Sequence, residues 1–378
     1  MAKNVDDIRN LVVCGHGSSG KTTLVDHLLV KSGAVSGQPS VDNGSSICDF
    51  DEEEKHHKHS IEAAVVHFDH AGKRFNVIDT PGYPDLIGQT IGAIRAVETA
   101  VITIDAHAGI KVNTRRVWKE AGDAGLGRIL CITKLDTDNI NFAGLIDSIK
   151  EVFGTQCVPF NVPIGQGHDL KGVVSTIDPP KEVAGALIDP TEMHEKVVES
   201  IIEADEAVME KYLEGEMPSK EVLQRLTAEA LRQGTLTPIV CVSTKMNVGV
   251  NELLEVLMQA TLPPSAIPRS GKKDGDDVTL KADPNAPLAA QVFKTRIDPF
   301  VQRLSFIRVF SGTLKKDSTV HVSGARKGIK IGPLLSVQAE KTTPIDQAIA
   351  GDIVAVAKTE DLHTGSSLGE VELPAIKF

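Results

Sequence analysis

The sequence has few cysteines, few aromatic residues and no long hydrophobic run. Its five cysteines include no Cys-x-x-Cys pair, which excludes a disulfide scaffold and indicates reduced thiols in a cytosolic protein. No apolar stretch approaches the roughly 18 residues that a transmembrane helix needs. Residues 1–7 also lack the hydrophobic core of a signal peptide. We therefore expect a cytoplasmic protein that makes no membrane contact.

The composition is otherwise that of a globular protein with an acidic surface. Hydrophobic residues make up 41% and charged residues 24% of the 378 residues, a length that accommodates two or three domains. The formal net charge of −11 argues against binding of nucleic acid through bulk electrostatics. Docking on a large ribonucleoprotein through local patches stays possible.

Residues 1–265 alternate short buried strands with helical patterns. Strands are expected at 11–14, 100–104, 129–132 and 238–242, a hairpin at 65–68 and 74–78, and helices near 21–31, 86–97, 112–124 and 249–260. This alternation predicts an α/β fold in which helices cover both faces of a mostly parallel sheet.

Three further segments complete the expected organisation. Residues from about 158 to 236 interrupt the alternation and predict an α+β insertion, with a small β piece at 172–174 and a long helical region after it. Residues 266–287 are rich in Lys, Asp, Gly and Pro, which is typical of a linker. Residues 288–378 carry short alternating strands separated by turns, so we expect a small β-barrel there.

A glycine-rich segment near the start of the chain carries the clearest chemical signal. Residues 15–22, Gly-His-Gly-Ser-Ser-Gly-Lys-Thr, fit G-x-x-x-x-G-K-[ST] between an expected strand and an expected helix. In such a loop the backbone N–H groups surround phosphates, and the helix N-terminus adds a positive dipole. Lys21 would reach the β- and γ-phosphates, and Thr22 would offer its hydroxyl to Mg²⁺.

Residues 79–82, Asp-Thr-Pro-Gly, follow a second expected strand. Alone, this run also makes an ordinary turn. Downstream of a phosphate-binding loop, Asp79 at a strand end can hold Mg²⁺ through water, and the Gly82 N–H can sense a γ-phosphate.

Two later strand ends carry residues suited to a guanine base. Residues 133–136 are Thr-Lys-Leu-Asp, and the Asp136 carboxylate can accept from guanine N1–H and N2–H₂, whereas adenine offers neither donor. The stem of Lys134 can lie along the base. Residues 243–245, Ser-Thr-Lys, follow another strand, where backbone N–H groups could meet guanine O6. This last signal depends on its position alone.

In this order the motifs resemble those of translational GTPases, most closely elongation factor G. The 106 residues between Asp136 and Ser243 are similar to an insertion of that family. The segments 193–199, 211–216, 299–314 and 350–352 also resemble the family in sequence. The resemblance covers essentially the whole chain but only the first two of the family's five domains, so we expect a portion of a longer protein. It implies a monomeric Mg²⁺-dependent GTPase whose partners are the ribosome, through ribosomal RNA and a stalk protein, and GTP or GDP.

The chain departs from the family's pattern at four places. Ser18 stands where the phosphate-binding loop usually has Asp, and Tyr83 stands where a histidine usually positions the attacking water. Thr133 replaces Asn and is too short to reach both the base and the phosphate-binding loop, so we expect modest affinity. Residues 57–60, His-Lys-His-Ser, replace Arg-Gly-Ile-Thr, and Ser60 keeps the hydroxyl expected at Mg²⁺ and the γ-phosphate.

The expected site residues fall into three groups. Those expected to take part in catalysis are Tyr83, Lys21 and Gly82. Those expected to hold the nucleotide are Gly15, His16, Gly17, Ser18, Ser19, Gly20, Lys21, Thr22, Thr23, Thr133, Lys134, Asp136, Ser243, Thr244 and Lys245. Those expected at Mg²⁺ are Thr22, Ser60 and Asp79.

Several alternatives stay open at this point. His56, His57 and His59 near three glutamates suggest a metal site, but a solvated switch loop explains them as well. The changes at Ser18 and Tyr83 also fit a ribosome-binding module that senses GTP with little hydrolysis, or a ribosomal protection factor. An ATP-using enzyme such as a kinase is a further alternative, which Asp136 and the β-barrel oppose.

Overall fold

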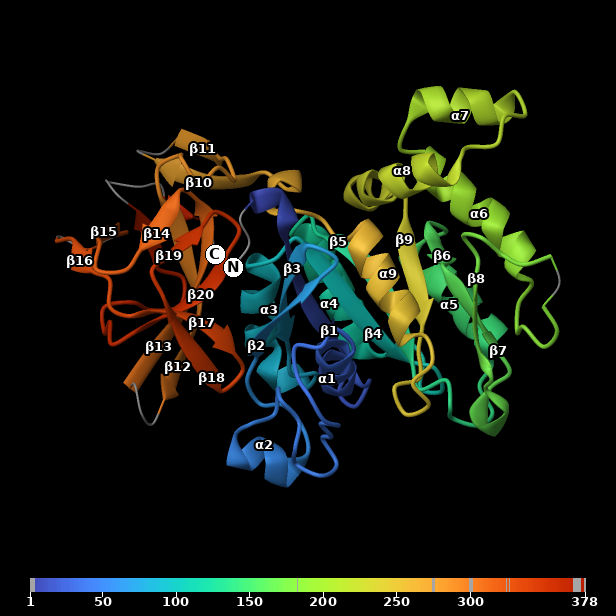
Figure 1. Ribbon diagram of the computed structural model, residues 1–378, viewed down its shortest axis with the longest axis horizontal. Helices are drawn as coiled ribbons and strands as arrows, with labels where there is room; N and C mark the ends of the chain where they lie inside the picture. The colour runs from blue at the N-terminus through green and yellow to red at the C-terminus, as the bar shows by residue number, and fades with distance from the viewer. Residues whose placement is uncertain are drawn as a thin grey trace.

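The computed structural model describes residues 4–369 and 375–376, apart from 182, 274–275, 299–301, 324 and 326. The start of the family-like run at 299–314, two positions of the expected linker and part of the barrel's C-terminal end therefore lie outside the described residues. The described chain forms an α/β domain, a β domain beside it and a helical excursion on the far side of the sheet (Figure 1).

Within the described residues, seven strands form the main sheet in the order β2-β3-β1-β4-β5-β9-β6, and every neighbouring pair except β2–β3 is parallel. The strands are β1 (Ile8–Gly15), β2 (Ala64–His70), β3 (Lys73–Asp79), β4 (Thr99–Asp105), β5 (Gly127–Thr133), β6 (Cys157–Pro159) and β9 (Thr237–Cys241). The expected mostly parallel sheet and the expected hairpin of β2 and β3 are confirmed.

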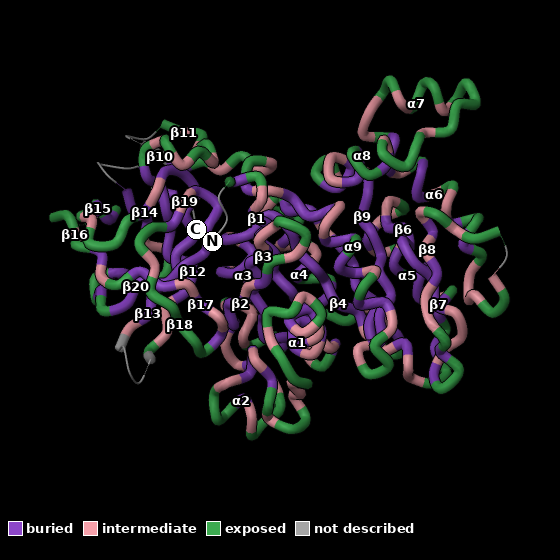
Figure 2. The backbone as a smooth tube through the Cα atoms, in the orientation of Figure 1, coloured by how far each residue is buried: buried purple, intermediate pink, exposed green. Residues whose placement is uncertain are grey.

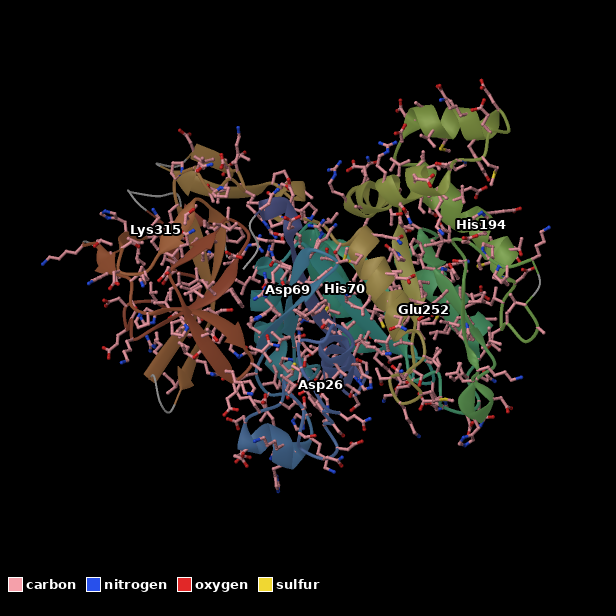
Figure 3. All side chains as sticks on the ribbon, in the orientation of Figure 1. Asp26, Asp69, His70, His194, Glu252 and Lys315 are labelled. Carbon is pink, nitrogen blue, oxygen red and sulfur yellow. The ribbon has the colours of Figure 1, made fainter. Side chains whose placement is uncertain are left out.

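Helices cover both faces of this sheet. They are α1 (Lys21–Lys31), α3 (Ile87–Arg95), α4 (Val112–Asp123), α5 (Phe142–Phe153) and α9 (Val250–Ala260). Side chains alternate across β1, so Val12 and Cys14 pack with α3, α4 and α5, whereas Leu11 and Val13 pack with α1 and α9. Both faces of the strands are therefore buried (Figure 2), which explains why their sequences are almost continuously apolar.

The expected insertion contains a hairpin and separate helices. The hairpin pairs β7 (Asn161–Ile164) with β8 (Gly172–Ser175), and the helices are α6 (Pro190–Ile202), α7 (Glu206–Leu213) and α8 (Lys220–Gln233). The expected helical region is divided into three helices, because Asp205 and Ser219 each cap the N-terminus of a new helix. Helix α7 has no buried residue and extends away from the rest of the chain (Figure 2).

Two elements at the start of this region were missed. Helix α5 precedes it, and β6 completes the main sheet by pairing with β9 at the edge. The sheet thus takes in residues 157–159, where the insertion was expected to begin. A three-residue strand leaves too short a pattern for periodicity to identify.

The C-terminal domain is an antiparallel half-barrel. Its main sheet has the order β16-β15-β21-β12-β13-β20-β17-β18. The strands are β12 (Ala289–Asp298), β13 (Gln302–Ser311), β15 (Thr319–Val322), β16 (Ile329–Lys330), β17 (Leu334–Gln338), β18 (Lys341–Ile345), β20 (Ile353–Ala357) and β21 (Ser367–Gly369), with β14 (Thr313–Lys315) and β19 (Gln347–Ile349) forming a separate pair.

The segment 266–287 is more ordered than a linker. Strand β10 (Arg269–Lys273) pairs with β11 (Asp276–Leu280) and with β22 (Ala375–Ile376). The sequence did not predict these strands, because β11 has no fully buried position and therefore shows no apolar alternation. In the part of the chain that the structure describes, no helix is long and apolar enough to cross a membrane.

The two domains meet over an interface that combines an apolar cluster, which includes Ile94 and Phe306, with polar contacts. At one end, His67 Nδ1 lies 2.7 Å from the carbonyl oxygen of Val337, and the Ala339 N–H donates to the Val65 carbonyl at 2.7 Å. At the other end, the buried Arg308 guanidinium donates to Glu98 Oε1 at 2.8 Å. These contacts link strand β2 and Glu98, the residue before β4, to the half-barrel.

Candidate guanine-nucleotide site

Four predicted motifs come together at one edge of the main sheet. The glycine-rich loop follows β1, Asp79 ends β3, Thr133 ends β5 and Ser243 lies beyond β9. These strands run parallel, so their carboxyl ends meet at the same edge. A cavity of about 1020 Å³ opens there. Its size and position suit a ligand as large as a nucleotide.

Most of the predicted site residues line this cavity. They are Gly17, Ser18, Gly20, Lys21, Thr22, Thr23, Ser60, Gly82, Tyr83, Lys134, Thr244 and Lys245. The remaining predicted residues, Gly15, His16, Ser19, Asp79, Thr133, Asp136 and Ser243, are not lining residues. Asp49, His59 and residues 37–43 also line the cavity and were missed. Their stretch of chain has no helical or strand periodicity that would have placed it there.

The glycine-rich loop is held tightly against β4 and α1. A Cβ on Gly15 would lie 2.5 Å from Thr103 Oγ1, so only glycine fits where the loop leaves the strand. Gly20 has a φ of 80° at the N-cap of α1. The Lys21 ammonium donates to the His16 carbonyl at 2.8 Å, and burial lowers the pKa of Lys21 while Asp79 opposes that shift. The loop therefore presents a confined cation at the start of a helix, which suits a phosphate.

The expected metal residues form a cluster of oxygen atoms. The Ser60 hydroxyl donates to Asp49 Oδ1 at 2.7 Å, and Thr22 Oγ1 lies 3.0 Å from Ser60 Oγ. In the described structure both carboxylate oxygens of Asp79, and Oδ2 of Asp49, are buried without a hydrogen-bond partner. Asp49 was not predicted, and it brings a second acid to the three predicted residues.

The electrostatics of this cluster suit a divalent cation. Burial, followed by repulsion from Asp49, raises the pKa of Asp79 to about 8, and burial also raises the pKa of Asp49. Mg²⁺ prefers oxygen ligands and usually completes its shell with water and phosphate oxygens. No group of three or more His, Cys, Asp or Glu side chains among the described residues is placed to hold a metal by itself. These residues therefore suit Mg²⁺ that binds together with a nucleotide.

The predicted base-binding residues meet beside the part of the cavity that Lys134, Thr244 and Lys245 line. Ser243 Oγ donates to Asp136 Oδ1 at 2.5 Å, although 106 residues separate the two in the sequence. Lys134 has a φ of 60°, and its ammonium pairs with Asp105 at 3.0 Å. The hydroxyl of Thr133 donates to the Ser19 carbonyl at 2.8 Å. Thr133 therefore reaches the glycine-rich loop with its one hydroxyl.

The Asp79–Gly82 segment packs directly on the glycine-rich loop. A Cβ on Gly82 would lie 2.3 Å from Lys21 Nζ and 2.6 Å from the Gly17 nitrogen, so the approach requires glycine. Asn113 Nδ2 donates to the Gly82 carbonyl at 2.7 Å. Tyr83 follows, and its ring lies beside Gly17 and remains 41% exposed. Gly82 and Tyr83 therefore lie against the loop that carries Lys21.

The loop expected around the three histidines is partly helical. Residues Glu52–His57 form the short helix α2, in which the Asp51 side chain accepts from the Glu53 N–H and the Asp51 N–H donates to Glu54. This pair of hydrogen bonds stabilises the helix start without an apolar stripe, so hydrophobic periodicity did not reveal it. His56 and His57 are exposed on α2.

Comparison with known proteins gives the family. Residues 6–263 match the elongation factor Tu GTP binding domain, and residues 287–371 match elongation factor G domain 2. The chain is 33% identical to an elongation factor G-like protein of Mycobacterium tuberculosis over 98% of its length, and 30% identical to elongation factor G of Thermotoga petrophila over 99%. It spans 56% of the length of each of these relatives.

A solved structure agrees with these matches. A crystal structure of a Thermus thermophilus protein superposes with a TM-score of 0.84 at 29% identity, covering 97% of this chain and 55% of that one. Both the matched residues and the arrangement of the two domains are thus shared with known proteins. The chain belongs to the elongation factor G-like family of translational GTPases.

Proposed function

We propose that this protein is a Mg²⁺-dependent GTP-binding and GTP-hydrolysing translation factor that acts on the cytoplasmic ribosome. One observation carries the proposal: the buried Asp79 carboxylate, whose two oxygens accept no hydrogen bond in the described structure, lies near Lys21, which lines a nucleotide-sized cavity. A charged group without a partner is costly to bury, and Mg²⁺ bound to phosphates would supply the missing partner.

The residues divide into two sets in this proposal. Lys21, Thr22, Asp79 and Ser60 hold the phosphates and Mg²⁺, and the family's pattern gives Ser60 this role. Asp136, Lys134 and Ser243 hold the guanine, because the fixed Asp136 carboxylate accepts from two donors that adenine lacks. Gly82 and Ser60 report the γ-phosphate by ordering their loops, as the two-state element of such switches.

Calorimetric binding with and without Mg²⁺ tests the first set of residues. We expect GDP and GTP to bind in the presence of Mg²⁺, with a large loss of affinity when EDTA removes the metal. A thousandfold excess of ATP should not displace either nucleotide. Displacement by ATP would instead support the ATP-using alternative and contradict the assignment of Asp136.

A second function, nucleotide sensing with little hydrolysis, is favoured by the position of Tyr83. Its ring lies against Gly17, where it acts as a cover over the phosphate end of the cavity. Multiple-turnover phosphate release with and without ribosomes separates the two functions. Release stimulated by ribosomes supports hydrolysis, whereas tight GTP binding without release supports a sensor or a protection factor.

We also propose that the insertion contacts a protein of the ribosomal stalk, as the family resemblance implies. Glu206 and Glu210 of helix α7 are exposed, so they can be changed without loss of core packing. Glu206→Lys with Glu210→Lys should leave nucleotide affinity unchanged and lower ribosomal stimulation. The same double change at Glu192 and Glu195 of α6 serves as the matched control. Equal stimulation of both double variants and wild type would contradict the contact.

A further inference from the structure

His59 is the residue of the histidine-rich segment that turns toward the nucleotide cavity. Helix α2 ends at Lys58, which has a φ of 54° and reverses the direction of the chain. Beyond that turn His59 is half-buried and lines the cavity, and the next residue, Ser60, is buried. His56 and His57 stay exposed on the helix. One imidazole of the three is thus placed at the cavity by the backbone.

The hydrogen bonding of His59 fixes which ring nitrogen is free. His59 Nδ1 lies 3.1 Å from the carbonyl oxygen of His57. A carbonyl oxygen only accepts, so Nδ1 must carry the hydrogen of this bond. In the neutral ring Nε2 is then a hydrogen-bond acceptor. Nε2 makes no hydrogen bond in the described structure, so it can accept one from water.

The surroundings of His59 belong to the phosphate end of the cavity. Its ring centroid lies 4.7 Å from that of Tyr83, with an angle of 59° between the two planes. Asp49 lies within electrostatic reach and accepts the hydroxyl of Ser60. The His57 ring is 5.7 Å away on the exposed side. Imidazole and phenol thus stand together beside the residues assigned to Mg²⁺.

We propose that His59 is a catalytic residue that holds the attacking water through Nε2, with Tyr83 covering it; the proposal rests on the GTP hydrolysis proposed above. The water oxygen bonds to the γ-phosphorus as the bond from that phosphorus to the β–γ bridging oxygen breaks. The electron pair of the broken bond stays on GDP, and the water protons leave with the phosphate product. His59 accepts a hydrogen bond and keeps its own protonation state.

The chemistry of the two rings explains why the imidazole is suited to this role. A phenol has a pKa of about 10 and must share its single hydroxyl between donating and accepting. Phosphoryl transfer depends chiefly on positioning of the nucleophile and on electrostatics, so a fixed acceptor is sufficient. His59 is fixed by the carbonyl at Nδ1 and by the Tyr83 ring, whereas Tyr83 has a partly exposed side chain.

Single-turnover GTP hydrolysis, with and without ribosomes, tests the assignment. His59→Ala should slow hydrolysis at least tenfold while GTP affinity changes less than threefold. His59→Gln should recover part of the rate, because its amide oxygen also accepts a hydrogen bond. His56→Ala, which changes an exposed histidine of the neighbouring helix α2, is the matched control and should keep the wild-type rate. Tyr83→Phe keeps the ring that covers the water, so it should keep a rate close to that of wild type.

The outcomes separate this assignment from the proposed function. If the wild type hydrolyses GTP and His59→Ala hydrolyses it at the same rate, the role of His59 is overturned and the proposed function is not. If His59→Ala and His59→Gln both lose as much GTP affinity as hydrolysis rate, His59 has a structural role, and its catalytic role is overturned. Tight GTP binding with no hydrolysis by wild type under either condition overturns both.

Discussion

Two buried polar clusters lie at opposite ends of β1, and they differ in how their charges are satisfied. At the domain interface, Glu98 is 0% exposed and accepts from Arg308 at 2.8 Å and from Asn10 at 2.9 Å. At the cavity, Asp79 is 1% exposed, and neither of its oxygens has a hydrogen-bond partner in the described chain. Two acids of equal burial thus have opposite surroundings.

The difference shows how a buried charge can indicate function. Glu98 meets counter-charges that the chain itself supplies, so its carboxylate joins the half-barrel to the sheet. Asp79 has Lys21 nearby but a second acid, Asp49, as well, and burial raises the pKa of Asp79 to about 8. A polar cluster that the chain leaves incomplete points to a ligand, whereas a complete one points to structure.

Removing Glu98 should have the largest effect of the changes considered. Glu98→Ala leaves the Arg308 guanidinium, which is 1% exposed, buried without its counter-charge. Loss of one partner of a buried ion pair costs about 3–5 kcal/mol of unfolding free energy. Urea unfolding should show this loss, with nucleotide affinity preserved in protein that remains folded.

The control for Glu98 is an ion pair of the same kind at the surface. Asp123 pairs with Lys119 on α4, and both side chains are more than half exposed. Asp123→Ala should change the unfolding free energy by no more than about 1 kcal/mol. A loss for Glu98→Ala as small as that of the control would contradict the view that the interface cluster depends on internal pairing.

At the opposite end of the sheet, Asp136→Asn should change specificity instead of stability. Each charge-assisted hydrogen bond contributes about 1.5–3 kcal/mol, so GDP affinity should fall at least tenfold. Xanthosine diphosphate should gain affinity, because an amide can donate to the 2-oxo group of xanthine. Competition calorimetry with both nucleotides measures the exchange. Asp138→Asn, two residues further on, is the control, and a loss of GDP affinity there would show a nonspecific charge effect.

The pH dependence of stability separates the clusters further. Asp352 lies on the half-barrel side of the interface, near Arg308, and burial raises its pKa to about 6. In the unfolded chain a carboxyl titrates near 3.9, so between about pH 4 and pH 6 the native state binds the extra proton. The free energy of unfolding should therefore fall as pH rises through that window, by on the order of 2 kcal/mol for this group.

Asp352→Asn isolates that contribution. The amide oxygen can still accept from the Ile349 N–H, which donates to Asp352 at 2.9 Å, so the local hydrogen bond survives. The wild-type loss of stability between pH 4 and pH 6 should shrink in the variant. Asp346→Asn, at an exposed position in the same domain, controls for the loss of one carboxyl. Parallel pH profiles for wild type and Asp352→Asn would contradict the assignment.

The sequence predicted the sheet and the motifs at its carboxyl edge because both leave local signals. Apolar runs marked the central strands, and the spacing of residues 15–22 marked the phosphate-binding loop. It did not predict Asp49, His59 or the hairpin of β10 and β11. Asp49 and His59 reach the cavity through a capped helix and a left-handed turn, and β11 has no buried face. Such placements depend on tertiary contacts that no periodic pattern records.

The smallest expected effect concerns Thr133, which links the base end of the cavity to the glycine-rich loop. Its hydroxyl donates to the Ser19 carbonyl at 2.8 Å. A hydroxyl has one hydrogen to give, whereas an amide has two, so Thr133→Asn can keep the loop contact and add one to the base. A neutral hydrogen bond is worth about 0.5–1.5 kcal/mol, so GDP affinity should rise by about twofold to tenfold.

Two further variants show whether that gain comes from the base. Thr133→Val keeps the shape but removes the hydroxyl, so it should weaken GDP binding by loosening the glycine-rich loop. In the Asp136→Asn background, Thr133→Asn should still improve binding of xanthosine diphosphate, because the added contact does not depend on the 2-position of the base. Calorimetry that shows unchanged or weaker GDP binding by Thr133→Asn would mean that residue 133 acts on the loop alone. The nucleotide end of the sheet would then be completed by Asp136 and Ser243 without it.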